Sequence, residues 1–450
     1  MKKSSFLKQA FAYIFCTLLL NYSVVSQNNS PEIANFQTVA DTLNKIVLLS
    51  YDLDDSEEQT AEVTLRISSD GGASYLFKSG ILEGDVGENV KIGKGKKIYW
   101  KYTDDDIVFK NLRFQLTADD GYEVNAADVL GKVNKDRLKE NVTKVYGYRH
   151  HESAAGKKKL EEVKNMISSA FDQSDIQLER QKYKYKEWPG ENIIGKIEGY
   201  DHDGETYIIC ARFDSSPESP GADDNASGVS GMMEIAKILS DYTFKKSIIF
   251  LGLDMQIYDF RGARQYIANK GIKKFENIAG AINLDMIGYY SDQPESQYIP
   301  TEFGLIYPKV FEAIKADDFR GNFVLNVSNG DSRELSASFV KAAATSMPAL
   351  KVRSVEVFNK GEHTRELAAS DHVPFWYAEI PAIHLGDGGP SRNPFFGTEQ
   401  DTPDRLNYSY MADIVQATMA TILELAEVSH ASTVDMGLSE YNSIKYSFLN

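Results

Sequence analysis

Carboxylates follow two apolar segments of this chain, and another stands at the start of a helical pattern. Arg212 and Asp214 come after the apolar residues 207–210, and Asp285 ends a later apolar segment. Asp224 stands at the mouth of the helical pattern, after a loop that contains proline and glycine. Side chains at strand ends and helix starts lie at the rim of an α/β sheet, where such sheets bind ligands. The sequence therefore predicts a ligand site built from these residues.

Residues 211–239 resemble the zinc-dependent aminopeptidases, a family whose relatives include the glutaminyl cyclases. In that family the first motif reads His-x-Asp and its His binds zinc, but here the His position is Arg212. Asp214 matches the Asp that orients the zinc-binding His. The resemblance implies that Asp224 is a zinc ligand, and that Asp285, within Asn-Leu-Asp-Met-Ile-Gly, is another.

The other family positions carry residues that cannot do the family's chemistry. The family has two adjacent glutamates before a Gly-Ser pair, and alignment of that pair with residues 262–263 places the glutamates at Gln256 and Ile257. The first glutamate is the general base, and glutamine cannot accept a proton at any working pH. The second ligates zinc, and isoleucine has no ligand atom. The last family ligand is a His whose position here is Gly397. The resemblance thus implies the aminopeptidase fold. Of the five expected metal ligands, only Asp224 and Asp285 are retained.

An arginine among carboxylates offers a physical replacement for the metal. Clustered carboxylates without metal ions repel one another or take up protons. A guanidinium carries fixed positive charge and donors suited to carboxylates, so Arg212 is expected to hold Asp224 and Asp285 together. The alternative is that Arg212 pairs with an acid at the surface. A hard cation such as calcium on Asp223, Asp224 and Asp285 is a further option.

The histidines leave open a zinc site with replacement ligands. A zinc site usually needs three or four Cys, His or carboxylate ligands, and His372 and His384 are expected nearest to the pocket. His150 and His151 precede the first helix of the α/β domain and are expected to be solvent-exposed, while His202 lies in a polar turn. A non-catalytic protein needs no cofactor, whereas an active hydrolase of this type needs zinc.

Two functional classes fit these residues, and a purely structural protein with a filled pocket is a third option. The first class is a non-catalytic descendant of the aminopeptidases that binds a peptide end or a protein partner. The second is an active exopeptidase with non-standard ligands, which needs a substitute base; Asp254 and Glu399 are the candidates nearby in sequence. The acidic rim of the pocket favours a ligand with a positive end. The predicted ligand-binding residues are Arg212, Asp214, Gln256, Asp371 and His372.

Strands and helices alternate from residue 146 onward, as in a three-layer α/β/α domain, and the resemblance implies a mixed central sheet. Helices are predicted at residues 156–171, 226–241, 261–268, 308–316, 332–343 and 408–428. Strands are predicted at residues 176–183, 192–198, 206–212, 247–253, 279–285, 322–327, 352–357 and 382–385.

A small all-β sandwich like a fibronectin type III domain is predicted for residues 27–121, because short strands with alternating residues recur there. Asp-Gly-Gly at residues 70–72 predicts a hairpin. A charged linker with one short helix spans residues 122–145, and the α/β domain spans residues 146–430. The tail, residues 431–450, is expected to add a strand or to stay without regular structure. The sandwich is interpreted as a spacer or as an adhesive module.

A secretory signal peptide is predicted for residues 1–26, where three lysines precede a short apolar run. The protein is therefore expected to be exported to the periplasm or out of the cell. The 450-residue chain has a net charge of −16, and removal of the three lysines with the signal peptide would leave −19. This charge argues against nucleic acid and anionic membrane as partners. No second apolar segment is long enough to span a membrane, and Cys210 would be the single remaining cysteine.

Overall fold

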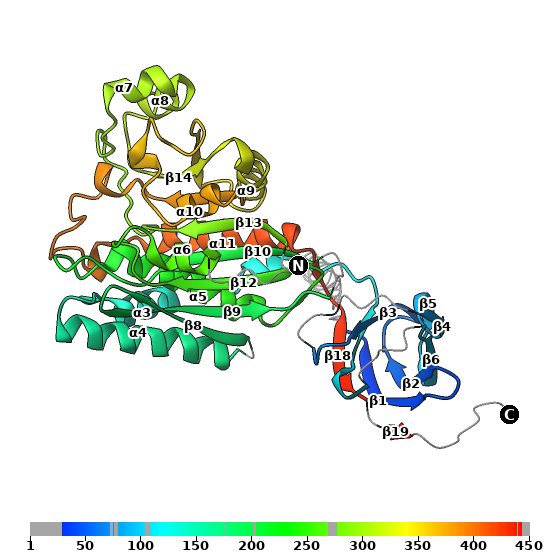
Figure 1. The fold of residues 1–450 in the computed structure, drawn as a ribbon. Coiled ribbons are helices and arrows are strands. Elements are labelled where there is room, and N and C mark those ends of the chain that lie inside the picture. The colour runs from blue at the N-terminus through cyan, green and yellow to red at the C-terminus, as the bar shows by residue number, and fades with distance from the viewer. Residues whose placement is uncertain are drawn as a thin grey trace, which may run out of the picture.

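A β-sandwich lies beside one end of a larger α/β domain (Figure 1). The computed structural model describes residues 29–72, 75, 80–103, 109–174, 176–200, 204–268, 277–438 and 440–442. The predicted signal peptide and His202 lie outside the described residues. Within the described part of the chain, no helix is both long and apolar enough to cross a membrane.

One eight-stranded sheet forms the centre of the α/β domain. Its strands, in spatial order, are β15 (Lys351–Glu356), β14 (Phe323–Ser328), β16 (Ala382–Gly386), β13 (Asn277–Leu284), β10 (Glu205–Arg212), β12 (Ser247–Leu253), β9 (Trp188–Ile197) and β8 (Gln177–Tyr185). The four strands β16, β13, β10 and β12 run parallel, whereas β14 and β9 are antiparallel to this group on either side. The sheet is therefore mixed, which confirms the predicted fold class.

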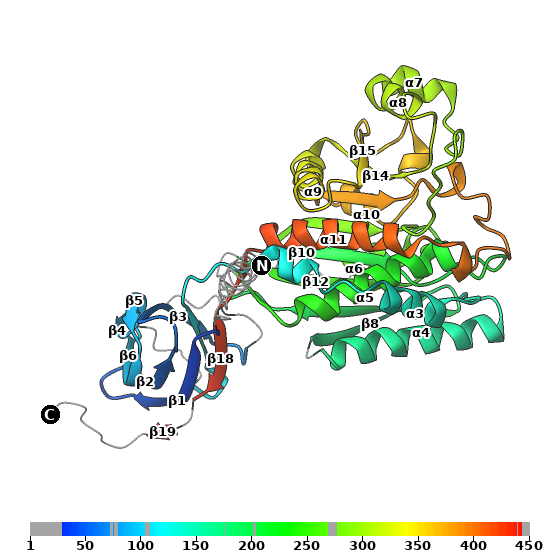
Figure 2. The ribbon, with the colours of Figure 1, turned by 180° about the vertical axis from the view of Figure 1, so that it is seen from behind.

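Helices cover both faces of this sheet (Figure 2). One face carries α3 (Lys135–Val145), α4 (Ala154–Asp172), α5 (Gly228–Leu239), α9 (Arg333–Ser346) and α11 (Tyr408–Leu425). The other face carries α6 (Arg261–Ala268) and α10 (His372–Tyr377). In β10, Ile209 and Ala211 belong to the first core, and Ile208 and Cys210 belong to the second. Because both faces are covered, the central strands read as continuous apolar runs.

The differences from the predicted elements have local causes. The helix predicted at residues 226–241 begins at Gly228, because the preceding residues form a separate turn, η2 (Ala222–Ser227). The short helix expected in the linker is the full helix α3, whose start is capped by the side chain of Asn134. Short helices escaped prediction because five or six residues carry little helical periodicity. They are α2 (Ala126–Leu130), α7 (Thr301–Ile306) and α10; α7 precedes α8 (Pro308–Lys315).

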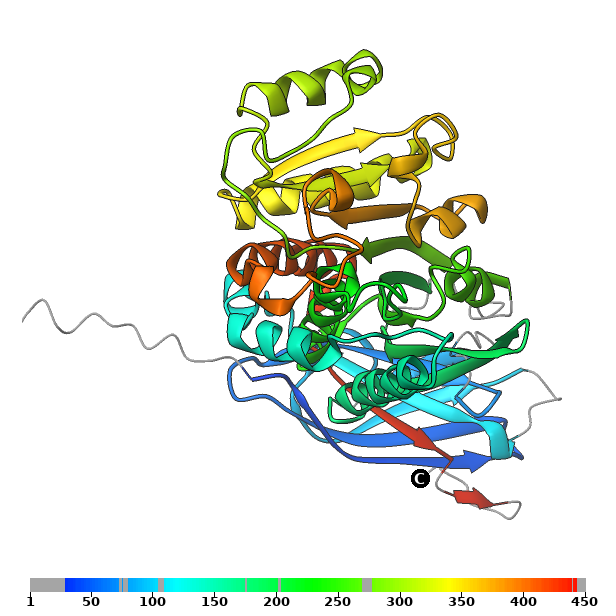
Figure 3. The ribbon, with the colours of Figure 1, turned by 90° about the vertical axis from the view of Figure 1, so that its left-hand side faces the viewer.

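The sandwich uses strands from both ends of the chain (Figure 3). Its first sheet has the order β19 (Glu440–Asn442), β1 (Glu32–Asp41), β2 (Ile46–Asp54), β6 (Gly93–Lys101) and β4 (Ile81–Gly84). The second has the order β18 (Ser432–Gly437), β7 (Arg113–Asp119), β3 (Thr60–Ser68) and β5 (Gly87–Lys91). The start of the C-terminal tail is thus a strand, β18, antiparallel to β7.

The hairpin predicted at residues 70–72 falls partly outside the described residues, because residues 73–74 and 76–79 are not among them. Strand β3 has β7 and β5 as its neighbours, so it does not pair with β4, the next strand along the chain, which lies in the other sheet. The Asp-Gly-Gly sequence supplies the positive φ angles of Gly71 and Gly72 for a turn that leads from one sheet to the other. Turn chemistry predicts a turn at this place but cannot say which strand comes next in the sheet.

Polar contacts join the sandwich to the α/β domain. The Asp119 carboxylate accepts hydrogen bonds from the hydroxyls of Tyr200 and Ser429, both at 2.8 Å. Arg66 donates to the backbone oxygen of Gly199 at 2.7 Å. These contacts lie at the strand ends remote from the candidate site, because Gly199 and Tyr200 precede β10 and the site residues follow it.

Candidate active site

Strand order and register bring the predicted site residues to one edge of the sheet. Arg212 is the last residue of β10 and lies in register with Leu253, the last residue of β12. Asp285 directly follows β13, which pairs with the other side of β10. Parallel strands end at the same edge of a sheet, so the loops after these three strands meet there.

Arg212 lies between the carboxylates of Asp224 and Asp285. Its Nη2 donates a hydrogen bond to Asp224 Oδ1, and its Nε lies 3.6 Å from Asp285 Oδ1. Its Nη1 donates to the backbone oxygen of Asp214 at 2.7 Å. Burial opposes the charge of this guanidinium, but attraction by Asp224 and Asp285 raises its pKa above the usual value. A lasting positive charge therefore stands between two carboxylates at this edge.

Gln256 and Ser370 donate hydrogen bonds to the second carboxylate oxygen of Asp285. Gln256 Nε2 donates to Asp285 Oδ2 at 3.0 Å. Ser370 Oγ donates to the same oxygen at 2.5 Å and accepts a hydrogen bond from Asn283 Nδ2 at 2.7 Å. With Arg212 beside its first oxygen, Asp285 is engaged on both sides by the protein itself.

Asp214 holds the loop that follows β12. Its two carboxylate oxygens accept hydrogen bonds from the backbone N–H groups of Gln256 and Ile257, at 3.2 and 3.4 Å. Burial raises the pKa of Asp214 to about 6, against the opposing attraction of Arg212. The two positions that the resemblance assigns to the family glutamates are therefore fixed by the acid of the first motif.

Asp371 and His372 are buried beside this cluster. Neither carboxylate oxygen of Asp371 has a hydrogen-bond partner among the described residues, and burial together with the charge of Asp285 raises its pKa well above the usual value. His372 Nε2 lies 3.2 Å from the backbone oxygen of Leu367, and burial lowers its pKa well below the usual range. The His384 ring lies 5.2 Å from the His372 ring, and burial lowers its pKa to about 4. Both rings are therefore neutral near pH 7.

The neighbouring acids Asp223 and Asp401 accept hydrogen bonds within and around the turn η2. The Asp401 carboxylate accepts hydrogen bonds from the backbone N–H groups of Asp223 and Asp224, at 2.8 and 3.2 Å. The carboxylate of Asp223 instead accepts from Gly288 N at 2.9 Å and from Asn393 Nδ2 at 2.8 Å. Burial, with the charge of Asp223, raises the pKa of Asp401 to about 7. The three acids considered for calcium do not converge on a common centre among the described side chains.

Sequence reasoning missed Arg149, which lies directly behind the site. This buried guanidinium donates five hydrogen bonds to backbone oxygens, including those of Phe213, Pro220 and Gly221 in the loop after β10. Burial lowers its pKa to about 10, helped by repulsion from Arg212. No pattern in the sequence marks this role, because the acceptors are backbone groups.

The candidate substitute bases are engaged elsewhere or exposed. Asp254 is buried, with Oδ1 2.9 Å from His151 Nε2 and Oδ2 accepting from Glu191 N at 3.2 Å. Glu399 is exposed. The expectation that His150 and His151 are solvent-exposed was wrong: their exposed fractions are 6% and 3%. The cause is tertiary, because Asp254 provides His151 with a buried polar partner that its sequence neighbours do not reveal.

The residues at the positions that the resemblance assigns to the metal do not fit a pair of zinc ions. Arg212 brings a positive charge between the carboxylates, Ile257 has no donor atom, and Gly397 has no side chain. At Gly262, which these assignments match to the glycine of the family pair, a Cβ would lie 2.3 Å from the backbone oxygen of Asp254, so only glycine is accommodated. Within the described part of the chain, no group of three or more His, Cys, Asp or Glu side chains is arranged to hold a metal ion.

Solved structures share the fold of the α/β domain. The LapA aminopeptidase of Legionella pneumophila is 20% identical, covers 68% of this chain, aligns over 77% of its own chain and gives a TM-score of 0.52. The aminopeptidase of Aneurinibacillus sp. strain AM-1 is 11% identical, with 67% of this chain and 96% of that chain covered and a TM-score of 0.51. At these identities the likeness shows the fold alone.

Sequence relatives show the family. The uncharacterised protein YfbL of Escherichia coli is 30% identical over 284 residues, which are 61% of this chain and 83% of YfbL. Aminopeptidase YwaD of Bacillus subtilis is 25% identical over 239 residues, which are 52% of this chain but only 44% of YwaD. The model of peptidase family M28 matches residues 192–422, which include the whole Arg212 cluster. The chain belongs to peptidase family M28.

Proposed function

We propose that this chain is an exported, non-catalytic member of the M28 family that binds a peptide or a protein partner without hydrolysing it. The observation that carries the proposal is the place of Arg212, whose guanidinium donates to Asp224 and lies 3.6 Å from Asp285. The resemblance assigns these two acids to zinc. A cation that is already part of the chain neutralises them and would repel a metal ion at the same place.

The base position gives independent support. Gln256 stands where the family has its general base, and its Nε2 donates to Asp285 Oδ2. An amide cannot take a proton from water at neutral pH. Asp254 is the nearest acid along the chain, and its carboxylate is already bound to His151 and to Glu191 N. Hydrolysis would therefore lack both the metal and the base.

An active zinc-dependent exopeptidase with non-standard ligands is the alternative. It is favoured by the relatives, because YwaD is named an aminopeptidase and a relative in Leptosphaeria maculans is named a probable zinc metalloprotease. Asp224 and Asp285, the two acids that the resemblance assigns to zinc, are also present. The chain spans less than two thirds of both relatives, 44% and 57% of their lengths.

Metal analysis and peptidase assays of the purified mature protein separate the two. We expect no stoichiometric zinc after dialysis against a weak chelator, and no release of N-terminal residues from peptides with free amines. YwaD assayed in parallel is the positive control. Arg212→His should restore neither zinc nor activity, because the base and two other ligand positions are still unsuited. Stoichiometric zinc, with hydrolysis that chelators abolish, would reject the non-catalytic proposal.

The ligand class can be tested at Asp371. Asp214, Asp224 and Asp285 are bound by groups of the chain itself, whereas both oxygens of Asp371 have no partner among the described residues. Asp371 is buried and its pKa is raised, so a peptide α-amino group that reached it would have to displace its proton to form an ion pair. Calorimetry with free-amine and acetylated peptides should show binding of the free amine alone, weakened by Asp371→Asn. Equal affinity for both peptides would place the ligand on another surface.

Export is proposed from residues 1–26, and the sandwich is proposed to be a spacer rather than an adhesive module. The N-terminal sequence of the protein recovered from the periplasm or the medium checks the first point, with a start at Gln27 as the expected result. Recovery only from the cytoplasm with the lysine-rich N-terminus intact would contradict it.

A further inference from the structure

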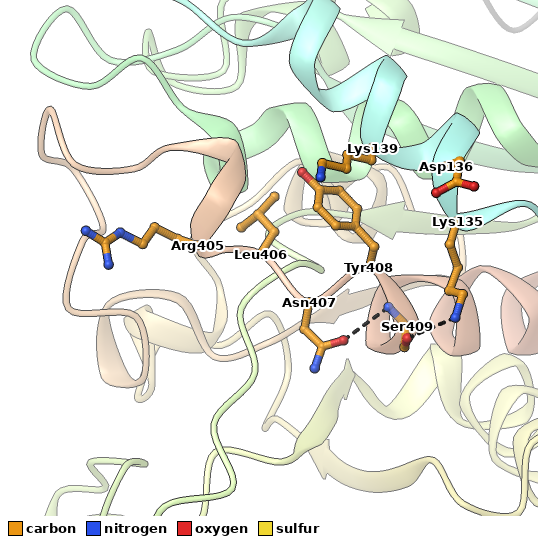
Figure 4. A pocket seen from close by; sticks show the side chains of 8 residues that line it. All are labelled: Lys135, Asp136, Lys139, Arg405, Leu406, Asn407, Tyr408 and Ser409. Atoms are coloured by element: carbon orange, nitrogen blue, oxygen red, sulfur yellow. Dashed lines mark hydrogen bonds between the residues drawn. The ribbon is translucent and has the colours of Figure 1, made fainter.

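A hollow of about 460 Å³ opens on the helical face of the α/β domain, where the first turns of α3 and α11 meet (Figure 4). The residues on α3 and α11 face each other across it, and the chain just before α11 closes one side. Its lining residues are Lys135, Asp136, Lys139, Arg405, Leu406, Asn407, Tyr408 and Ser409. Three of them are cations and one is an acid, in a chain whose net charge is −16.

Two lysines of α3 provide the charge of the hollow. Lys135 Nζ donates to Ser409 Oγ at 3.3 Å, which is a neutral partner. Lys139 Nζ lies 6.0 Å from the centre of the Tyr408 ring. Among the described residues, no carboxylate lies within ion-pair distance of either ammonium group. Arg405 stands at the rim and lies 4.4 Å from the Phe395 ring, directed away from the lysines (Figure 4).

The helix ends add to this positive potential. Lys135 is the first residue of α3 and Tyr408 the first residue of α11, so two helix N-termini meet at the hollow. Helix N-termini carry partial positive charge and normally have acids nearby. The first turn of α11 has no acidic residue. Two cations one helical turn apart repel each other. Asp136 in the first turn of α3 lines the hollow and Asp413 attracts Lys135, so the three cations of the lining are only partly balanced.

We propose that the hollow binds a small multivalent oxyanion, a ligand with carboxylate or phosphate groups that lie between Lys135 and Lys139. The volume is within the range of small-molecule sites, and the hydroxyl of Ser409 and the ring of Tyr408 offer further contacts. The buried Leu406 forms the floor and packs against Gly288, which separates the hollow from the Arg212 cluster. This site is independent of the proposed loss of catalysis.

Calorimetry at constant ionic strength tests the proposal with two probes, inorganic pyrophosphate and citrate. We expect saturable binding of at least one, and the tighter of the two tells phosphate from carboxylate as the natural group. Lys135→Gln and Lys139→Gln should each weaken binding about tenfold, as expected for loss of one charge-assisted contact. Lys158→Gln, at an exposed lysine of α4, is the matched control and should leave the affinity unchanged.

Folding of the variants is checked by thermal unfolding without added anion. Because each variant removes one of two like charges, its midpoint should equal or slightly exceed that of the unchanged protein. Pyrophosphate should then raise the midpoint of the unchanged protein and of Lys158→Gln, but not that of Lys139→Gln. Absence of saturable binding for both probes, or an equal loss in Lys158→Gln, would overturn the proposal.

Discussion

Two arginines, Arg149 and Arg212, are buried next to each other at the candidate site, and they do different work. Arg149 donates all five of its hydrogen bonds to backbone oxygens and touches no carboxylate in those bonds. Arg212 donates to Asp224 and lies beside Asp285. Burial and repulsion from Arg212 lower the pKa of Arg149 to about 10 despite the charges of nearby acids, whereas attraction by Asp224 and Asp285 raises that of Arg212.

The two arginines have different roles: Arg149 stabilises the backbone behind the site, and Arg212 is part of the site itself. Arg149 fixes the conformation of the loop after β10 by donating to backbone carbonyl groups, which are present whatever the neighbouring side chains are. Arg212 is needed because the carboxylates of Asp224 and Asp285 are buried and like-charged, which is costly without a cation. One arginine therefore satisfies the backbone, and the other balances charge. Substitutions that remove the charge but keep the volume should expose this difference.

The largest effect is expected for Arg149→Met. Methionine fills similar space but donates no hydrogen bond, so five backbone oxygens each lose one donor. The oxygens of Pro220 and Gly221 keep the N–H groups of Gly147 and Ala226, and the other three lose the guanidinium as their partner. Each unsatisfied buried group costs about 1–3 kcal/mol, and partial relaxation leaves an expected loss of about 5 kcal/mol in the free energy of unfolding. Urea unfolding measures it. The control is Arg333→Met, because Arg333 pairs with Glu356 at an exposed position and should cost less than about 1 kcal/mol.

Arg212→Met should cost about 3–5 kcal/mol, since it leaves buried carboxylates without their cation. This loss should depend on pH. Without Arg212 the pKa values of Asp214 and Asp224 rise further above their unfolded values, so these acids stabilise the fold when protonated and cease to do so as pH rises through the folded pKa. The deficit relative to the unchanged protein should therefore be smaller at pH 5 than at pH 8.

The same pH series on Arg149→Met sharpens the comparison. Its lost hydrogen-bond partners are carbonyl oxygens, which do not titrate, and its charge acts on Asp224 only without a hydrogen bond. Its deficit should therefore change less between pH 5 and pH 8 than that of Arg212→Met. Equal pH dependence of the two variants would mean that Arg212 does not act by balancing charge. A neutral effect of Arg212→Met at pH 8 would have the same meaning.

The sequence was sufficient to predict the layers of the α/β domain because the central strands are apolar throughout and the long helices are strongly periodic. The strand predicted at residues 247–253 and the helix predicted at residues 261–268 have the observed bounds. A strand in the tail is one of two expectations from the sequence, but its partner could not be predicted. The six residues of β18 are mixed in polarity and form a strand by pairing with β7, more than 300 residues earlier in the chain.

Only part of the site could likewise be predicted from the sequence. Motif spacing placed Arg212, Asp224 and Asp285 at one edge of the sheet, because the edge is set by strand ends. The roles of Arg149 and of Asp254 as a buried partner of His151 could not be read, since they depend on which loops meet in space. The use of Asp401 to hold the backbone of η2 is a contact across 177 residues, with no local signal.

The smallest effect is expected for Ser370→Ala. Ser370 Oγ donates to Asp285 Oδ2 at 2.5 Å and accepts from Asn283 Nδ2 at 2.7 Å, so alanine removes one donor and one acceptor. Asp285 keeps Gln256 Nε2 on the same oxygen and Arg212 beside the other, which limits the loss to about 1–2 kcal/mol. Asn283 keeps a contact with His384 Nδ1 at 3.5 Å. The double variant with Arg212→Met should lose more than the sum of the single losses, because Asp285 then retains Gln256 alone. Additive losses in urea unfolding would show that Ser370 and Arg212 do not share Asp285.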